Sequence, residues 1–164
     1  MPNILITGTT GNIGTEVIRF LNKKSSDNRI IAGVRNIEKA KLAFKGFSTL
    51  KFVHFDFENP DTFKNALLDI DLVFLLRPPH ISDVDRFFKP LISAIKEQNI
   101  QKIVFLSVQG AEKSKVIPHN KIERLITTSG LDYIFLRPSY FMQNLTTTLI
   151  GDIQTKREII LSTG

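Results

Sequence analysis

The fold of this chain follows from the stretch Ile4-Leu5-Ile6-Thr7-Gly8-Thr9-Thr10-Gly11-Asn12-Ile13-Gly14. Its three leading apolar residues predict a short buried strand, and the glycines after them predict a tight turn into a helix. The third glycine lets that helix pack closely against the strand. Free amide groups and the positive dipole end of a helix N-terminus attract phosphate. Glycines also fill ordinary turns, but this triplet falls directly between a strand and a helix, which favours a nucleotide-binding turn.

The composition is that of one globular domain, which we take as residues 1–164. The chain has no cysteine, which excludes disulfides, thiolate catalysis and cysteine-based metal sites. No uninterrupted apolar run is long enough to cross a membrane, and the N-terminus shows no secretory signal pattern. We therefore expect a cytoplasmic protein with no membrane partner.

The net charge of +6 raises the question of nucleic-acid binding. Lysine and arginine are spread along the chain, however, without a basic run or a recognisable reading helix. A solvated basic surface that favours an anionic ligand is the better explanation of the charge. We expect no nucleic-acid partner.

Apolar runs and helix signals alternate along the whole chain. Strands are predicted at residues 4–6, 29–34, 50–55, 72–76, 102–107 and 133–136. Helices are predicted after the glycine turn to about Leu21, from Asn36, from Asn59 to about Asp69, from Ser82, at 118–129 and around 141–144. Pro90 is expected to kink the fourth of these or split it in two. The alternation predicts an α/β fold, a doubly wound parallel sheet of the Rossmann type, with ligands at the carboxyl ends of the strands.

Arg35 follows the second predicted strand, about twenty residues beyond the glycine turn. An NAD-binding domain usually has an acid there, which holds the ribose 2′-hydroxyl. An arginine instead accepts a 2′-phosphate through charge-assisted hydrogen bonds, and Lys39 would add a second cation. The alternative is an ordinary surface arginine. The pattern favours NADP(H) over NAD(H).

Asp56 and Phe57 end the third predicted strand, where they would meet the adenine edge. An acid that approaches a helix and a core phenylalanine explain them equally well. His119 and Glu123 are four residues apart and share a helix face, so they are a candidate acid–base pair. A surface pair is the alternative. Two such ligands are too few for a metal, and we expect none.

Tyr133 and Tyr140 suggest a search for the Tyr-x-x-x-Lys pair of short-chain dehydrogenases, in which the lysine lowers the phenol pKa. The residues four further on are Arg137 and Asn144, so the pair is absent. This argues against a standard short-chain dehydrogenase and against a sugar-nucleotide epimerase. Ser107 ends the fifth predicted strand and, without such a tyrosine, is expected to contact a cofactor.

The chain resembles the NmrA-like branch of the atypical short-chain dehydrogenases/reductases over almost its whole length. The motifs that carry the resemblance are the glycine turn, Val34-Arg35-Asn36, the His119-x-x-x-Glu123 helix and Leu136-Arg137-Pro138-Ser139-Tyr140-Phe141-Met142-Gln143-Asn144. That branch includes NADPH-dependent quinone reductases, azoreductase-like proteins and redox-sensing regulators. Its members continue further and add a C-terminal subdomain over the substrate, so we expect that part to be largely missing from this chain.

The resemblance implies a role for each matched residue. The pyrophosphate would be held by Gly8, Thr10, Gly11, Asn12, Ile13 and Gly14. The rest of the cofactor would contact Arg35, Lys39, Asp56, Phe57, Leu76, Arg77, Pro78, Ser107 and Pro138. A lysine stands where His119 falls in plant relatives, which implies a polar or acid–base role supported by Glu123. The substrate would meet Tyr140, Phe141 and Asn144.

These expectations describe an NADP(H)-binding oxidoreductase of the quinone reductase type, with a small quinone-like substrate and His119 as the proton donor. The alternative is a catalytically silent NADP(H) sensor that acts through a protein partner. An epimerase-like protein ranks lower, for want of the tyrosine. A homo-oligomer is open in each case.

Overall fold

The computed structural model describes residues 1–24, 28–139, 141–146 and 149–159. One parallel sheet has the strand order β3-β2-β1-β4-β5-β6. Its strands are β1 (Asn3–Ile6), β2 (Arg29–Val34), β3 (Lys51–His54), β4 (Leu72–Leu76), β5 (Lys102–Leu106) and β6 (Asp132–Leu136). The helices are α1 (Asn12–Lys23), α2 (Ile37–Ala43), α3 (Asp61–Ala66), α4 (Val84–Glu97), the 3-10 helix η1 (Ala111–Lys113), α5 (Pro118–Ser129), α6 (Gln143–Thr146) and α7 (Ile150–Lys156). The predicted doubly wound α/β fold is confirmed.

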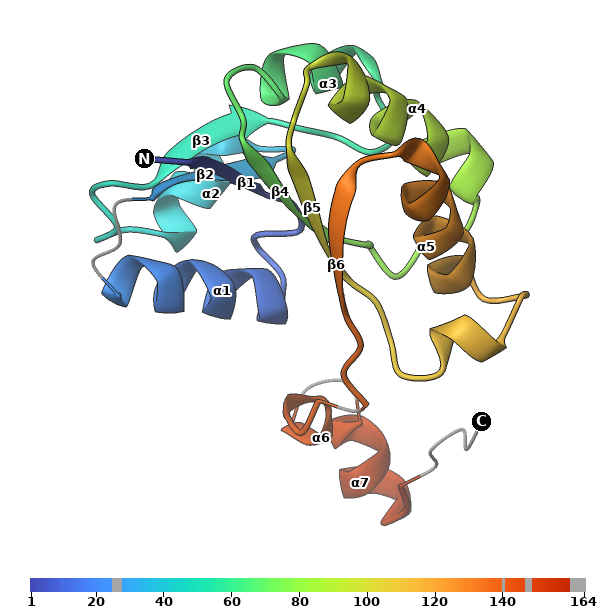
Figure 1. Ribbon diagram of the computed structural model, residues 1–164. Helices are drawn as coiled ribbons and strands as arrows, with labels where there is room; N and C mark the ends of the chain where they lie inside the picture. The colour runs from blue at the N-terminus through green and yellow to red at the C-terminus, as the bar shows by residue number, and fades with distance from the viewer. Residues whose placement is uncertain (25–27, 140, 147–148, 160–164) are drawn as a thin grey trace.

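Helices cover both faces of the sheet (Figure 1). In β1, Ile4 and Ile6 pack with Ile18 of α1 and Ala40 of α2. Leu5 lies between them in sequence and packs in the other core, with residues of α3, α4 and α5. Successive side chains of a strand point to opposite faces, so a strand covered on both sides must be apolar throughout. This is why the short apolar runs became central strands.

The strand order reverses at β1, which lies between β2 and β4. Residues Ile4–Ile6 pair with β2 on one side and with β4 on the other. A crevice forms at such a point, because the connections after the two central strands run to opposite faces. The glycine turn follows β1 and Arg77 follows β4, so both lie at this crevice.

Two helix starts show where local patterns succeed and fail. The predicted cap at Asn36 is confirmed, since its Oδ1 accepts a hydrogen bond from the Lys39 backbone N–H at 2.9 Å. The predicted cap at Ser82 is wrong. Asp83 takes this position, and its Oδ1 accepts from the Arg86 N–H at 3.0 Å. Serine and aspartate are comparable caps, so neighbouring candidates are decided by the path of the chain.

Two helices bear on these expectations. The long helix α4 continues through Pro90 as one element, so the alternative of two separate helices is wrong. Proline removes one internal hydrogen bond, but the buried Phe88 and Leu91 beside it keep that face packed. The third helix ends at Ala66, short of the predicted Asp69. Asp69 has φ of 56°, a left-handed conformation that ends a helix.

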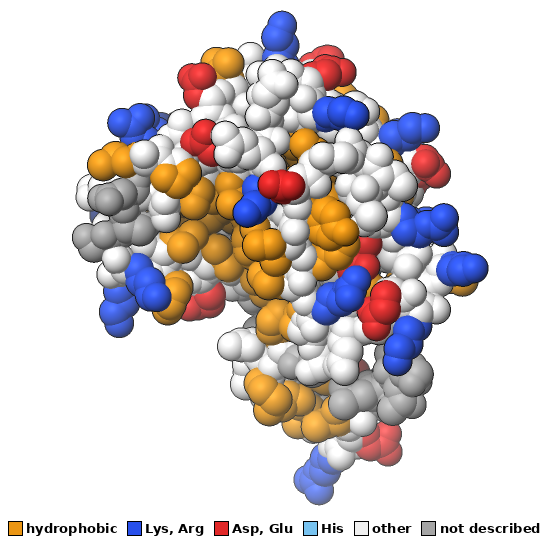
Figure 2. Space-filling model, in the orientation of Figure 1, with side chains coloured by type: hydrophobic (Ala, Val, Ile, Leu, Met, Phe, Trp, Pro, Cys, Tyr) orange, Lys and Arg blue, Asp and Glu red, His pale blue; other side chains and the backbone are white. Residues whose placement is uncertain are grey.

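The strand β6 forms one edge of the sheet and is more open than the others. Tyr133, Ile134 and Leu136 each expose more than two fifths of their surface, and hydrophobic side chains gather where β6 runs in Figure 2. The helices α6 and α7 lie apart from the two layers (Figure 1). The short helix predicted around residues 141–144 forms slightly later, as α6. No helix in the described ranges combines the length and apolar character needed to span a membrane.

Candidate functional site

The glycine turn has a backbone path that only glycine permits at two positions. Gly8 has φ of +60°, in the left-handed region. A Cβ on Gly14 would stand 2.3 Å from the Gly8 carbonyl oxygen and 2.7 Å from the Thr9 Cα. Real Cβ atoms do not approach backbone this closely, so Gly14 is needed for α1 to lie against the turn. The predicted function of the third glycine in packing is confirmed.

The first turn of α1 presents unpaired donors. The Gly11 N–H bonds the Gly8 carbonyl at 3.1 Å, and the Thr15 N–H bonds the Gly11 carbonyl at 3.0 Å. Between them, the backbone N–H groups of Asn12, Ile13 and Gly14 have no acceptor in the described part of the chain. No acidic side chain stands in this turn. Three free amides at the positive end of a helix form a site for an anion such as phosphate.

Hydrogen bonds of three threonine hydroxyls hold the glycine turn in place. Thr7 Oγ1 accepts a hydrogen bond from the Leu76 N–H at 2.8 Å, which ties β1 to the end of β4. Thr9 Oγ1 donates to the Gly33 carbonyl at 3.4 Å, and Thr15 Oγ1 donates to the Thr9 carbonyl at 3.0 Å. Thr7 and Thr9 are fully buried. Sequence reasoning missed these threonines, although a hydroxyl in a buried glycine turn must find a partner.

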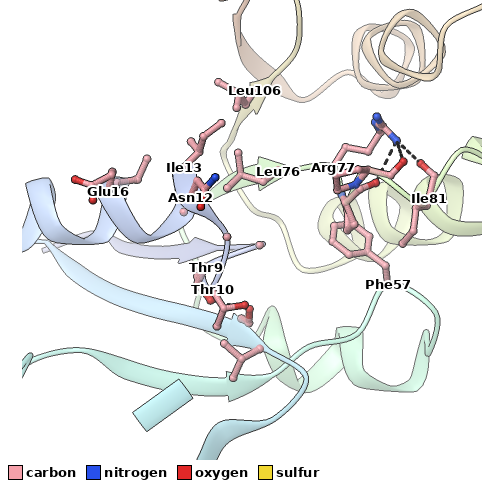
Figure 3. Close-up of a pocket in the computed structure, with 18 of the residues that line it drawn as sticks. Thr9, Thr10, Asn12, Ile13, Glu16, Phe57, Leu76, Arg77, Ile81 and Leu106 are labelled. Atoms are coloured by element: carbon pink, nitrogen blue, oxygen red, sulfur yellow. Dashed lines mark hydrogen bonds between the residues drawn. The ribbon is translucent and has the colours of Figure 1, made fainter. Parts of the chain in front are cut away.

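A cavity of about 860 Å³ opens over the turn and along the carboxyl ends of the strands (Figure 3). The predicted site residues that line it are Gly8, Thr10, Gly11, Asn12, Ile13, Gly14, Arg35, Asp56, Phe57, Leu76, Arg77, Pro78, Ser107, His119, Phe141 and Asn144. Lys39, Glu123 and Pro138 are not among its lining residues. Tyr140 lies outside the described residues.

Several lining residues were not foreseen. They are Thr9, Glu16, Val17, Phe20, Leu21, Gly33, Val34, Phe55, Glu58, Pro79, His80, Ile81, Leu106, Val108 and Gln143. Most are neighbours in sequence of residues that were predicted. Ligands bind at the carboxyl ends of strands, and most of these residues would be found by including the one or two residues on either side of each predicted position.

Arg35, the arginine predicted to bind a 2′-phosphate, lies at the cavity without a carboxylate partner in the described ranges. Arg35 is also exposed. Its guanidinium is therefore available to a ligand. Lys39 lies one helical turn further on, where its backbone N–H is used in the Asn36 cap.

Asp56 and Phe57 both line the cavity and also have structural partners. Asp56 Oδ1 accepts a hydrogen bond from the Glu58 N–H at 3.0 Å, which stabilises the turn after β3. The Phe57 ring is buried between Phe55, at 4.9 Å between centroids, and Phe88, at 5.3 Å. The sequence left open whether Asp56 and Phe57 support the fold or border a ligand. The two roles are compatible, since both residues have structural partners and also line the cavity.

Arg77 and His119 meet inside the cavity. The Arg77 Nη1 donates to the carbonyls of Pro78, Pro79 and Ile81 at 3.1, 3.0 and 2.7 Å, as the dashed lines of Figure 3 indicate. Its Nε donates to His119 Nε2 at 3.4 Å. Burial, and then the Arg77 charge, lower the pKa of His119 against the opposing Glu123 charge, and the net value is about 4.

The expected acid–base pairing of His119 with Glu123 is wrong. Glu123 makes a bidentate ion pair with Arg137, with Oε1 accepting from Nε at 2.9 Å and Oε2 from Nη2 at 2.8 Å. Burial raises the pKa of the Glu123 carboxyl, but the hydrogen bonds from Arg137 and Ser107 and the charges of Arg137 and His119 together hold that pKa below its usual value. A charge-assisted bidentate bond is stronger than a bond to neutral imidazole, so the carboxylate turns to arginine. A carboxylate bonded to the imidazole would raise the pKa of His119, whereas that pKa is lowered.

Ser107 stands between these groups at the end of β5. Its side chain is almost completely buried, and its Oγ makes no well-formed hydrogen bond within the described residues. The hydroxyl is nevertheless near enough to Glu123 to contribute to the lowered pKa of that carboxyl. Ser107 also lines the cavity.

Comparison with known proteins identifies the family. The family model described as NAD(P)H-binding matches residues 8–158. The chain belongs to this NAD(P)H-binding family. The match contains the whole glycine turn from Gly8 onward and every strand from β2 to β6. The predicted NAD(P)-binding Rossmann resemblance is confirmed.

Two proteins similar in sequence to this chain are named for different roles. Prestalk A differentiation protein A of Dictyostelium discoideum is 37% identical over 143 residues, which are 87% of this chain and 46% of that protein. An NmrA-like family domain-containing oxidoreductase of Aspergillus flavus is 24% identical over 150 residues, which are 85% of this chain and 48% of that protein. The chain spans about half the length of these curated relatives.

A solved structure is similar over almost the whole chain. The NADPH-dependent quinone oxidoreductase of Escherichia coli, complexed with NADPH, is 25% identical with a TM-score of 0.78. The match covers 93% of this chain and 54% of that one. The free amides at the start of α1 fit the pyrophosphate of an NAD(P)H cofactor.

Proposed function

We propose that this NAD(P)H-binding chain prefers NADP(H) over NAD(H) and belongs to an oxidoreductase of the quinone reductase type. The observation that carries the cofactor preference is the presence of two groups of anion donors along one cavity. The free amides of α1 suit the pyrophosphate, and the unpaired Arg35 suits the 2′-phosphate. An acid at the Arg35 position would repel that phosphate, and none stands there.

The proposed cofactor contacts follow the cavity in order. The pyrophosphate lies over the turn from Gly8 to Gly14, and Asp56 and Phe57 border the adenine. Leu76, Arg77 and Pro78 line the ribose and nicotinamide end, near the Ser107 hydroxyl. Lys39 and Pro138 complete the proposed set as neighbours of Arg35 and Ser107, rather than as residues of the cavity wall.

A bound nicotinamide cofactor supplies a hydride, and the chain supplies orientation and electrostatics. Phe141 and Asn144 line the cavity and are proposed to border the substrate, with Tyr140 as a further proposed contact. Apolar lining residues such as Leu106 and Ile81 suit a flat, uncharged ring. The E. coli relative named for quinone oxidoreduction supports this acceptor class.

A second function is a NADP(H) sensor that acts through a protein partner. Tyr133 lies on β6, is more than two fifths exposed, and does not line the main cavity. It therefore cannot replace the tyrosine of short-chain dehydrogenases. The D. discoideum relative is named for differentiation rather than for a reaction. A sensor needs the cofactor site alone.

Binding and turnover separate these functions. NADPH and NADH are titrated into the 164-residue chain by calorimetry, and NADPH oxidation is then followed with a small quinone. Tighter binding of NADPH together with quinone-dependent oxidation supports the reductase. Binding without oxidation supports the sensor. Equal affinity for both cofactors contradicts the 2′-phosphate site, and binding of neither contradicts both functions for this chain.

A further inference from the structure

Arg77 is held by its own loop rather than by a carboxylate. One guanidinium nitrogen, Nη1, lies within hydrogen-bond distance of three carbonyl oxygens of the loop after β4, those of Pro78, Pro79 and Ile81 (Figure 3). No Asp or Glu side chain in the described ranges pairs with it. Backbone carbonyls fix the plane of the guanidinium, which in turn fixes the direction of its Nε–H.

That Nε–H points at the imidazole of His119, with 3.4 Å between Nε and Nε2. A guanidinium has donors only and does not lose its proton in proteins. The His119 Nε2 must therefore accept, which leaves the ring proton on Nδ1. The Phe105 ring stacks against the imidazole at 6.0 Å between centroids and 28° between planes, so the orientation of the ring is fixed from a second side.

The other ring nitrogen is free for a ligand. Nδ1 makes no hydrogen bond within the part of the chain that the structure describes, and His119 lines the main cavity. A neutral imidazole with Nε2 occupied can offer only one polar group to a bound molecule, the Nδ1–H donor.

We propose that Arg77 is a positioning residue that holds His119 as the neutral Nδ1–H tautomer, so that His119 donates a hydrogen bond to the acceptor oxygen of a bound carbonyl compound. The proposal rests on the reductase function above. When NADPH transfers its hydride and is oxidised, the electron pair of the acceptor's carbonyl bond moves to oxygen. The Nδ1–H stabilises that oxygen and keeps its proton, and the oxygen takes a proton from solvent water.

The charges around the ring agree with this assignment. Arg77 approaches from the loop after β4 and Glu123 lies on α5 itself, and these two charges act on His119 in opposite senses. Burial and Arg77 together outweigh Glu123, and the pKa falls to about 4. The carboxylate is occupied by Arg137, which limits its ability to draw a proton to the ring. The imidazole therefore stays neutral at physiological pH.

The test is the imidazole spectrum of the ¹⁵N-labelled chain without cofactor. The chain has only three histidines, His54, His80 and His119, and His119→Gln assigns the third. Long-range ¹H–¹⁵N correlations distinguish the two tautomers directly. At neutral pH, His119 is expected as the Nδ1–H form, and on acidification it should titrate near pH 4.

Arg77→Met is expected to move His119 toward the Nε2–H tautomer that prevails in water and to raise its pKa, though not fully to 6.5, because burial remains. Arg77→Lys keeps a donor and should retain part of the effect. The control is Arg86→Met, which removes an arginine on α4 outside the cavity and should leave the His119 signals unchanged.

If the wild-type chain shows His119 as the Nε2–H tautomer, the proposal is wrong. This test needs no variant, so it remains decisive even if Arg77→Met fails to fold. Unchanged His119 signals in a folded Arg77→Met also overturn it. These readouts need neither cofactor nor turnover. A failure of NADPH binding would therefore contradict the proposed function, while the tautomer result would still decide the role of Arg77.

Discussion

Replacement of Gly14 by alanine tests the geometry of the glycine turn. Alanine is the better helix former, and by propensity alone the change would stabilise α1 by about 1 kcal/mol. The new Cβ, however, would lie 2.3 Å from the Gly8 carbonyl oxygen, about 1 Å inside ordinary contact, and its neighbours there are backbone atoms. Overpacking of this kind costs about 1–3 kcal/mol, and rigid backbone places the cost at the upper end. The net expectation is a destabilisation of about 2 kcal/mol.

The assay is thermal and urea unfolding followed by circular dichroism, and an NADPH titration. A loss of about 2 kcal/mol lowers the Tm by roughly 4–8 °C in a domain of this size. NADPH affinity should also fall, because relief of the clash displaces α1 and its free amides from the Gly8 turn. Urea midpoints report the same change independently, provided that the m-value is unaltered.

Gly151→Ala is the matched control. Gly151 is also helical, in α7, and a Cβ there meets nothing within 4 Å. Alanine should leave stability unchanged or increase it by up to about 1 kcal/mol, with NADPH affinity unaltered. If Gly14→Ala were as stable as Gly151→Ala and bound NADPH like the wild type, the close approach of α1 to the turn would be refuted.

Three further changes test the rest of the site. Arg35→Ala should weaken NADPH binding by roughly tenfold to a hundredfold and leave NADH binding unchanged. This factor corresponds to about 1.5–3 kcal/mol for hydrogen bonds to a charged group. Equal effects on both cofactors in calorimetry would contradict the 2′-phosphate role of Arg35. The pKa of His119 is lowered on folding, so the unfolded chain binds more protons, and stability should fall as the pH decreases from 6.5 to about 4. His119→Gln should flatten that part of the urea-unfolding profile, and a slope that persists would contradict the lowered pKa. Glu123→Gln should destabilise the chain by about 1–2 kcal/mol, since it breaks the bidentate ion pair with the partly exposed Arg137. The variant should also lose less stability than the wild type below pH 4.5, because the carboxylate with the lowered pKa is gone. An unchanged urea midpoint would contradict this contribution of Glu123.

The strands and the location of the cavity were predictable because they depend on short-range patterns. Short apolar runs became strands, and the glycine triplet marked the turn from β1 into α1. The carboxyl-end rule then placed Arg35, Arg77 and Ser107 at one cavity, although they are far apart in sequence. The helix cap at Asp83 was missed by one residue, since two adjacent side chains were equally suited to it.

Side-chain pairing in the site was not predictable in the same way. A spacing of four residues correctly placed His119 and Glu123 on one helix, but each found its partner on another element, Arg77 after β4 and Arg137 after β6. These two arginines lie at the carboxyl ends of β4 and β6, the two strands that flank β5. Helical spacing carries no information on such long-range partners, which depend on strand register and on charge.

The strand register explains how the site separates these two arginines. Leu106 pairs with Leu136 across β5 and β6, and the Ser107 N–H bonds the Leu136 carbonyl at 2.8 Å, so Arg137 leaves the sheet beside Ser107. Glu123 is drawn to that side by its two hydrogen bonds from Arg137. The cation that remains at His119 is Arg77, which can only donate. The ion pair between Glu123 and Arg137 thus keeps the carboxylate of Glu123 away from the cavity, and the neutral imidazole of His119 remains there as a hydrogen-bond donor.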